Sequence, residues 1–269
     1  MSNTRQSSGA QQKTACVHKS MEPQKQNYAI PVAIVIAGLL IAGAVMWGRA
    51  ATAPTPEQSR KEKLASINRL IQNVPIATST DHLLGNPAAP VVVIEYSDIE
   101  CPFCRSFHPT MQQIMTEYGT RGEVAWGYRQ FPLDIHPKAY PASLAAECVA
   151  NLYDSTNFWK FINALMETKI GSNEYPTGVI SDTLSAEERV AEASKKLSLD
   201  TTKISACVSA ETYKQKLVDL RAEGIKAGLG QNDTGTPYSI IIAGQNRYFI
   251  DGAQPYEAVK ALIDKALTQ

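Results

Sequence analysis

The chain has 269 residues, with 26 basic and 26 acidic side chains and a formal net charge of zero. This balance argues against nucleic-acid binding, which normally requires a basic face. The length suffices for one large domain with additional segments. The five cysteines are an odd number, so at least one of them is free or shared with another molecule.

The N-terminal part of the chain changes composition sharply. Residues 1–27 are polar and lack hydrophobic periodicity, which predicts a disordered tail whose Cys16 is an unpaired thiol. Residues 28–48 contain no charged side chain and are rich in Ala, Ile, Val and Leu. Such a stretch can cross a bilayer as a helix, and Tyr28 and Trp47 suit the interfaces at its ends. We therefore predict a single transmembrane anchor over residues 28–48.

A cleaved secretory signal is the alternative for this span. The segment Ala51-Thr52-Ala53 has the small-residue spacing of a signal-cleavage site. The apolar run is longer than a usual signal core and follows a long tail, so an uncleaved anchor is favoured. Basic residues flank the span on both sides, and their count does not decide its orientation.

Residues 49–81 are expected to form a linker that contains one short helix. Residues 51–57 have the Pro- and Thr-containing composition of a connector. Apolar side chains then recur at helical spacing, at Leu64, Ile67, Leu70 and Ile71. We favour a helix that packs on the following domain or spaces it from the membrane. Self-association is the alternative, but the stretch is short for a coiled coil.

A Cys-x-x-Cys motif stands between a predicted buried strand and a predicted helix. The strand is the apolar run Val91–Ile94, and the helix extends from Cys101 toward Gly119. The free N–H groups and partial positive charge of a helix N-terminus stabilise a thiolate. Cys101 is therefore predicted to be an exposed nucleophile, and Cys104, one turn later, the resolving thiol. Pro102 suits the first helical turn, where its missing N–H costs nothing.

Half of a zinc site is the alternative interpretation of this motif. A site with four thiolates needs a second close pair, whereas Cys148 and Cys207 stand far apart in the sequence. The setting between a strand and a helix favours redox chemistry. We expect no metal, and no cofactor other than a redox-active disulfide.

The remaining elements predict an α/β domain interrupted by helices. Residues 123–129 form the next strand, which makes a right-handed βαβ unit with the first. From about 136 to 230 the pattern is helical only, and strands return near the C-terminus before a closing helix. The predicted segments are helices at 137–153, 157–168, from 185, at 201–209 and from 210, strands at 238–242 and 248–250, and a helix at 256–267.

From residue 82 to its end, the chain resembles the DsbA-like thiol–disulfide oxidoreductases of the thioredoxin superfamily. Besides the Cys-Pro-Phe-Cys motif, the segments that carry the resemblance are Leu84–Val91, Glu95–Asp98, Phe131–Leu133 with His136, Gly235–Pro237 and Gly252–Tyr256. The resemblance implies a thioredoxin-like fold with a helical insertion, here preceded by one transmembrane helix. It also implies disulfide chemistry in an oxidising compartment, outside the cytoplasmic membrane of a bacterium, with the tail inside.

The resemblance implies roles for residues beyond the two cysteines. The Thr236–Pro237 bond should be cis and lie next to the dithiol, where Thr236 could pair with an extended substrate. Pro102 and Phe103 should complete the substrate-binding surface. Glu95 should be a buried carboxylate that moves protons for Cys104, although an alternating strand could leave it in solvent. Arg129 is a candidate ion-pair partner of Glu95.

Other expectations concern the disulfide and the histidines. Cys148 and Cys207 lie on apolar helix faces of an exported domain, so we expect a structural disulfide between them, with two buried reduced cysteines as the alternative. His108 is expected at the surface, and His136 is expected to cap a loop or satisfy a local hydrogen bond rather than to act in catalysis.

The expected function is oxidation of exported proteins by the Cys101–Cys104 disulfide. Its partners would be cysteine-containing exported proteins and a membrane redox protein of the DsbB or DsbD type. The alternatives are an isomerase or reductase kept reduced by a membrane partner, and a non-enzymatic chaperone or metal carrier. The best-known family member has His where Phe103 stands, so we expect a milder oxidant.

Overall fold

The computed structural model describes residues 29–52, 55–77, 80–167, 184–231 and 233–268. The predicted disordered tail and Cys16 lie outside these residues. The chain divides into two compact units, Met1–Thr55 and Pro56–Gln269, and each is considered by itself.

The described residues of the first unit include the helix α1 (Ala29–Thr52), in which the side chains of residues 32–46 are exposed. This helix continues four residues beyond the expected end of the membrane anchor at 48. Within the described ranges, no helix combines the length and apolar content that crossing a membrane requires. The anchor over residues 28–48 stays a prediction.

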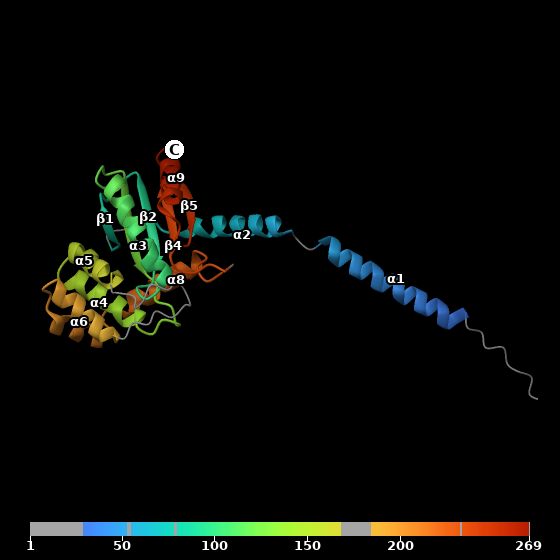
Figure 1. Ribbon diagram of the computed structural model, residues 1–269, viewed down its shortest axis with the longest axis horizontal. Coiled ribbons are helices and arrows are strands. Elements are labelled where there is room, and N and C mark those ends of the chain that lie inside the picture. The colour runs from blue at the N-terminus through green and yellow to red at the C-terminus, as the bar shows by residue number, and fades with distance from the viewer. Residues whose placement is uncertain (1–28, 53–54, 78–79, 168–183, 232, 269) are drawn as a thin grey trace, which may run out of the picture. The chain divides into compact units, whose positions relative to one another are not determined.

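The second unit is built on a five-stranded sheet of order β1-β3-β2-β4-β5 (Figure 1). Strands β2 and β3 are parallel, and the other neighbours are antiparallel. The central strands β2, β3 and β4 are buried along their whole length, as strands covered on both faces should be. The strands are β1 (His82–Gly85), β2 (Val91–Ser97), β3 (Val124–Gln130), β4 (Tyr238–Ala243) and β5 (Asn246–Asp251).

Helices from both ends of the unit cover the sheet. On one face lie α3 (Pro102–Ile114), its π-helical continuation η2 (Met115–Gly119) and α9 (Tyr256–Leu267), which pack on Val91 and Val93 of β2. The intervening residues of β2 point to the other face, because side chains alternate along a strand. The two faces therefore have separate hydrophobic cores.

The second core contains the helix expected in the linker. This helix is α2 (Pro56–Leu70), followed by the 3-10 turn η1 (Ile71–Asn73). Ile67 and Ile71 are fully buried against the sheet, while Leu64 is about half exposed. The interpretation of a helix that packs on the domain is thus the one that the contacts support.

The helical insertion is centred on α4, which packs against α5, α6 and α7. Figure 1 shows α4, α5 and α6 gathered beside the sheet. A side-chain cap begins three of the helices, supplied by Asp154, Ser185 and Asp200, so their start positions are set locally. The helices are α4 (Ala139–Leu152), α5 (Ser155–Met166), α6 (Ala186–Lys196), α7 (Thr201–Ser209) and α8 (Lys214–Lys226).

One feature of this region was expected from the sequence, and one goes beyond the sequence analysis. Cys148 of α4 and Cys207 of α7 form the expected disulfide, which spans 59 residues of sequence. Helix α8, included in the expected insertion, also contacts the sheet, where its Gly224 lies against the rings of Phe131 and Tyr96. The architecture is a thioredoxin-like α/β fold with a helical insertion, as expected.

Candidate active site

The dithiol lies at the junction between β2 and α3. Cys101 is the N-cap residue of α3, with extended backbone at φ −65° and ψ 124°, and Pro102 follows as the first helical residue. The two thiols are not joined in this structure. Cys104 is fully buried, and Cys101 is only 3% exposed. The expectation of an exposed Cys101 is therefore wrong, because Thr236 covers its sulfur, with the carbonyl oxygen 3.4 Å away.

The surroundings shift the pKa values of the two thiols in opposite directions. A hydrogen bond from the Cys104 thiol lowers the pKa of Cys101 to about 6, against the opposing effect of burial. The Thr236 side chain and the backbone N–H groups of Cys104 and Phe103 lower it further. Those N–H groups belong to the first turn of α3, so part of the effect is the expected one of the helix N-terminus. Burial, followed by the interaction with Cys101, raises the pKa of Cys104 well above its usual range.

The loop that contains Thr236 and Pro237 completes the site. Their peptide bond is cis, and both residues are buried. Phe103 is 51% exposed on the outer side of the first turn of α3, beside the partly buried Pro102. Four residues expected to contact substrate thus surround Cys101 from two directions: the start of α3 and the turn before β4.

Glu95 lies in β2 beneath Cys104 and is completely buried. The indole Nε1 of Trp126 donates a hydrogen bond to its Oε2 over 3.0 Å, whereas Oε1 has no partner among the described residues. Burial is the main cause that raises the pKa of Glu95 to about 7. The alternative of a solvated Glu95 does not hold, and a carboxyl group with this pKa can give or accept a proton near neutral pH.

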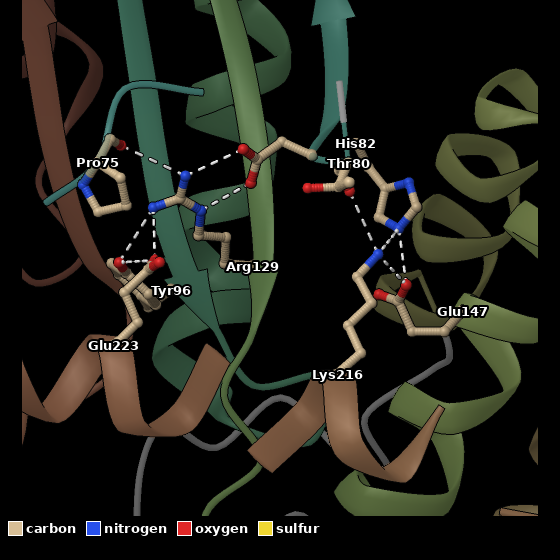
Figure 2. Close-up of polar contacts among 9 residues, drawn as sticks. Pro75, Thr80, His82, Tyr96, Arg129, Glu147, Lys216 and Glu223 are labelled. Atoms are coloured by element: carbon tan, nitrogen blue, oxygen red, sulfur yellow. Dashed lines mark hydrogen bonds and ion pairs between the residues drawn. The ribbon is translucent and has the colours of Figure 1, made fainter. Parts of the chain in front are cut away.

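The proposed ion pair between Glu95 and Arg129 is wrong. In the parallel register Glu95 lies opposite Tyr128, so Arg129 projects from the other face of the sheet. Arg129 forms ion pairs with two carboxylates, Asp81 at 2.7 Å and Glu223 at 2.6 Å. Figure 2 shows the guanidinium group directed toward Glu223. Arg129 therefore ties α8 and the segment before β1 to the sheet, away from the dithiol.

Asp98 organises the turn between β2 and α3, a role that the sequence analysis did not assign. Its Oδ1 accepts hydrogen bonds from the N–H groups of Glu100 at 2.7 Å and Cys101 at 3.0 Å. Its Oδ2 accepts from the N–H of Leu133 at 2.7 Å and from Nδ1 of His136 at 2.9 Å. A polar residue directly after a buried strand and before the motif is the signal that could have identified it.

The two histidines compare differently with expectation. His108 is 2% exposed rather than at the surface, and its Nε2 lies 2.7 Å from Oδ1 of Asn163. The backbone N–H of His136 makes a local hydrogen bond to the Leu133 carbonyl, as expected, but its imidazole bonds to Asp98, 38 positions earlier in the chain. This contact brings His136 next to the turn that presents Cys101.

The chain is similar to known proteins in sequence and in fold. The family model described as Thioredoxin matches residues 77–265. "Probable disulfide bond formation protein D" of Bacillus cereus is 27% identical over 199 residues, which are 72% of this chain and 82% of that protein. "Na(+)/H(+) antiporter NhaA 1" of Salinispora arenicola is 28% identical over 150 residues, which are 55% of this chain and 22% of the antiporter. The chain thus spans less than a quarter of that relative's length.

Solved structures share the fold. Wolbachia pipientis alpha-DsbA1 has a TM-score of 0.60 at 22% identity, with 74% of this chain and 96% of that chain covered. BdbD from Bacillus subtilis in its oxidised form has a TM-score of 0.58 at 20% identity, with 70% and 94% covered. Since the Thioredoxin match extends over more than half of its residues, this chain belongs to the thioredoxin family.

Proposed function

We propose that the chain is an extracytoplasmic thiol–disulfide oxidoreductase that donates the Cys101–Cys104 disulfide to cysteines of exported proteins. The observation that carries this proposal is the asymmetry of the two thiols. The pKa of Cys101 is lowered to about 6, whereas that of Cys104 is raised. The sulfur of Cys101 is therefore suited to be attacked and later to leave as a thiolate. The sulfur of Cys104 is suited to be released and then protonated.

The exchange proceeds in two balanced steps. A substrate thiolate attacks Sγ of Cys101, a substrate–Cys101 disulfide forms, and the Cys101–Cys104 bond breaks with Cys104 leaving as a thiolate. A second substrate thiolate then attacks the substrate sulfur, and Cys101 leaves. The substrate dithiol loses two electrons and gains a disulfide, while the enzyme pair becomes a dithiol. A leaving thiol of low pKa departs faster, which favours Cys101 in the second step.

Protons and substrate need additional groups. Because the Cys104 thiolate is unstable in its buried position, it must take up a proton, and the neighbouring Glu95 with a pKa of about 7 is suited to supply it. An extended substrate could pair with the backbone at Thr236, while the exposed ring of Phe103 offers apolar contact. These residues would orient a cysteine-containing segment over Cys101.

The stabilised thiolate of Cys101 supports the oxidase direction. Stabilising the reduced form of a dithiol makes its disulfide more oxidising. The side chain of Phe103 supplies no hydrogen bond or charge, so we expect an oxidant of moderate strength. A membrane protein of the DsbB type would restore the disulfide, and the chain itself would be held at the membrane by residues 28–48.

The reduction potential of the protein, equilibrated with glutathione buffers, tests the proposal. We expect a value more oxidising than the thioredoxin value of about −270 mV, together with disulfide formation in a reduced, unfolded substrate. The variant Phe103→His should shift the potential further in the oxidising direction. A potential at or below that of thioredoxin, with no net oxidation of substrate, would instead favour the reductase or isomerase alternative.

A further inference from the structure

We propose that His136 is a positioning residue of this site. Acting through the Asp98 carboxylate, it holds the turn before Cys101 and offsets the negative charge beside that thiolate. The inference deepens the proposed function and rests on it, since it assigns the regulation of Cys101 to a residue outside the Cys-x-x-Cys motif.

Asp98 connects directly to both cysteines. Its carboxylate accepts the backbone N–H of Cys101 at 3.0 Å, and its own N–H lies 3.4 Å from the sulfur of Cys104. The side chain is completely buried. Any movement of Asp98 would therefore shift the N-cap of α3 and the contact to the resolving thiol together.

The loop after β3 supplies hydrogen-bond donors to the other oxygen of the Asp98 carboxylate. The His136 N–H donates to the Leu133 carbonyl over 2.9 Å, which closes a turn and directs two donors at Asp98: the Leu133 N–H and the imidazole. A carboxylate oxygen can only accept, so Nδ1 carries the proton in this contact. Of the four donors to Asp98, the imidazole of His136 is the one that can carry a positive charge.

A positive charge on His136 would give its contact with Asp98 an electrostatic effect in addition to its structural one. A buried carboxylate close to Cys101 disfavours a second negative charge on that sulfur. A protonated His136, with its side chain only 11% exposed, would offset that carboxylate where solvent screening is weak. The Phe103 position provides no cation, and His136 supplies one from a different part of the chain.

The surroundings of His136 favour its protonated form. The hydrogen bond to Asp98 raises the pKa of His136 despite partial burial, and the charges of Asp98, Cys101 and Glu100 act in the same direction. A cavity of about 270 Å³ beside the imidazole is also lined by Asp134, Tyr140 and Arg221. Arg221 is paired with Asp134 at 2.8 Å.

Two substitutions separate the hydrogen bond from the charge. His136→Asn places a neutral amide N–H near the position of Nδ1, and His136→Ala removes both donor and charge. We expect the pKa of Cys101 to rise in both, so that iodoacetamide alkylation of the reduced protein at pH 5 slows about threefold in His136→Asn and more in His136→Ala. Asp134→Asn, in the same loop but directed at Arg221, is the matched control and should leave the rate unchanged.

A second measurement needs no variant. Coupling between two sites is reciprocal, so removing the thiolate by alkylating Cys101 should lower the pKa of His136 in an NMR titration of the full chain. Rate–pH profiles that superimpose on the wild type in both variants, or an unchanged His136 titration after alkylation, would overturn the proposal. Both readouts use reduced protein without substrate, so they stay informative even if the oxidase function fails.

Discussion

The sulfur of Cys101 lies 3.4 Å from the carbonyl oxygen of Thr236, 135 positions later in the chain. This contact joins the start of α3 to the turn before β4, and it buries a thiol that the sequence alone placed in solvent. Under the proposed function, a substrate that reaches Cys101 would lie against the Thr236 backbone. This arrangement would couple access to the sulfur with recognition of the substrate backbone.

Substitution of each active-site cysteine should have a different effect. Cys104→Ser should trap mixed disulfides with substrate on Cys101, because the resolving thiol is gone, while Cys101→Ser should lose exchange altogether. Non-reducing electrophoresis and turnover with a reduced, unfolded substrate measure both outcomes. Full turnover by Cys101→Ser would show that the nucleophile has been assigned to the wrong residue.

The reactivity of Cys101 should follow a titration with a midpoint at about pH 6. The pKa of Cys101 is lowered first by the Cys104 thiol and then by further hydrogen bonds. Alkylation rates and thiolate absorbance of the reduced protein measure this midpoint, and Cys104→Ser provides an absorbance reference for a single thiol. A midpoint near the ordinary thiol value of about 8.5 would contradict the acidity on which the proposed function depends.

Glu95→Gln should change how stability depends on pH. Burial raises the pKa of Glu95 from 4.5 to about 7, so between these values the folded protein keeps a proton that the unfolded chain has lost. The contribution of this bound proton to the free energy of unfolding is complete below pH 4.5 and is lost as pH rises through 7. The total loss is up to about 3 kcal/mol. Glu95→Gln should remove that loss.

Urea unfolding of the oxidised protein at pH 5 and pH 8 checks this expectation. In the oxidised protein Cys101 is in a disulfide, so its ionisation does not contribute to the pH dependence. The exposed Glu192→Gln on α6 serves as the control and should follow the wild type. Glu95→Gln should also slow formation of the substrate–Cys101 disulfide, because the departing Cys104 loses its proton donor. An equal decline in stability with pH for Glu95→Gln and wild type would refute the buried, proton-holding carboxyl group.

The Cys148–Cys207 disulfide should stabilise the helical insertion. For a bridge that closes 59 residues, chain entropy gives about 4 kcal/mol, so Cys148→Ala/Cys207→Ala should unfold at clearly lower denaturant concentration. Peptide mapping of the native, air-oxidised protein should find neither thiol alkylated. Alkylation of both thiols in that sample would exclude the bridge in solution.

Residues 28–48 should keep the full chain in the membrane. The span has no charged side chain, so alkaline washing should not release the protein, and the N-terminal tail should be protected on the cytoplasmic side. Membrane fractionation and protease protection measure this. A mature N-terminus near Pro54 would show instead that the span is a cleaved signal.

Much of the local structure could be predicted from the sequence. The bounds of α7 and α9 agree with the expected helices, and the cysteines lie between a strand and a helix as predicted. These features depend on interactions within a few residues: apolar periodicity, the Asp200 cap and the proline after Cys101. Local determinants are contained in a short segment, so composition and spacing reveal them.

The tertiary structure decided which distant residues meet. Strand register buried Glu95 under Cys104 and sent Arg129 to the opposite face, although both stand in similar apolar runs. The pairing of β1 with β3 and the contact of His136 with Asp98 likewise join segments that share no local pattern. Sequence by itself determined most of the elements, although not β1, and the reactive motif. The acidity of that motif was decided by packing, because burial and charge depend on neighbours that only the folded chain brings together.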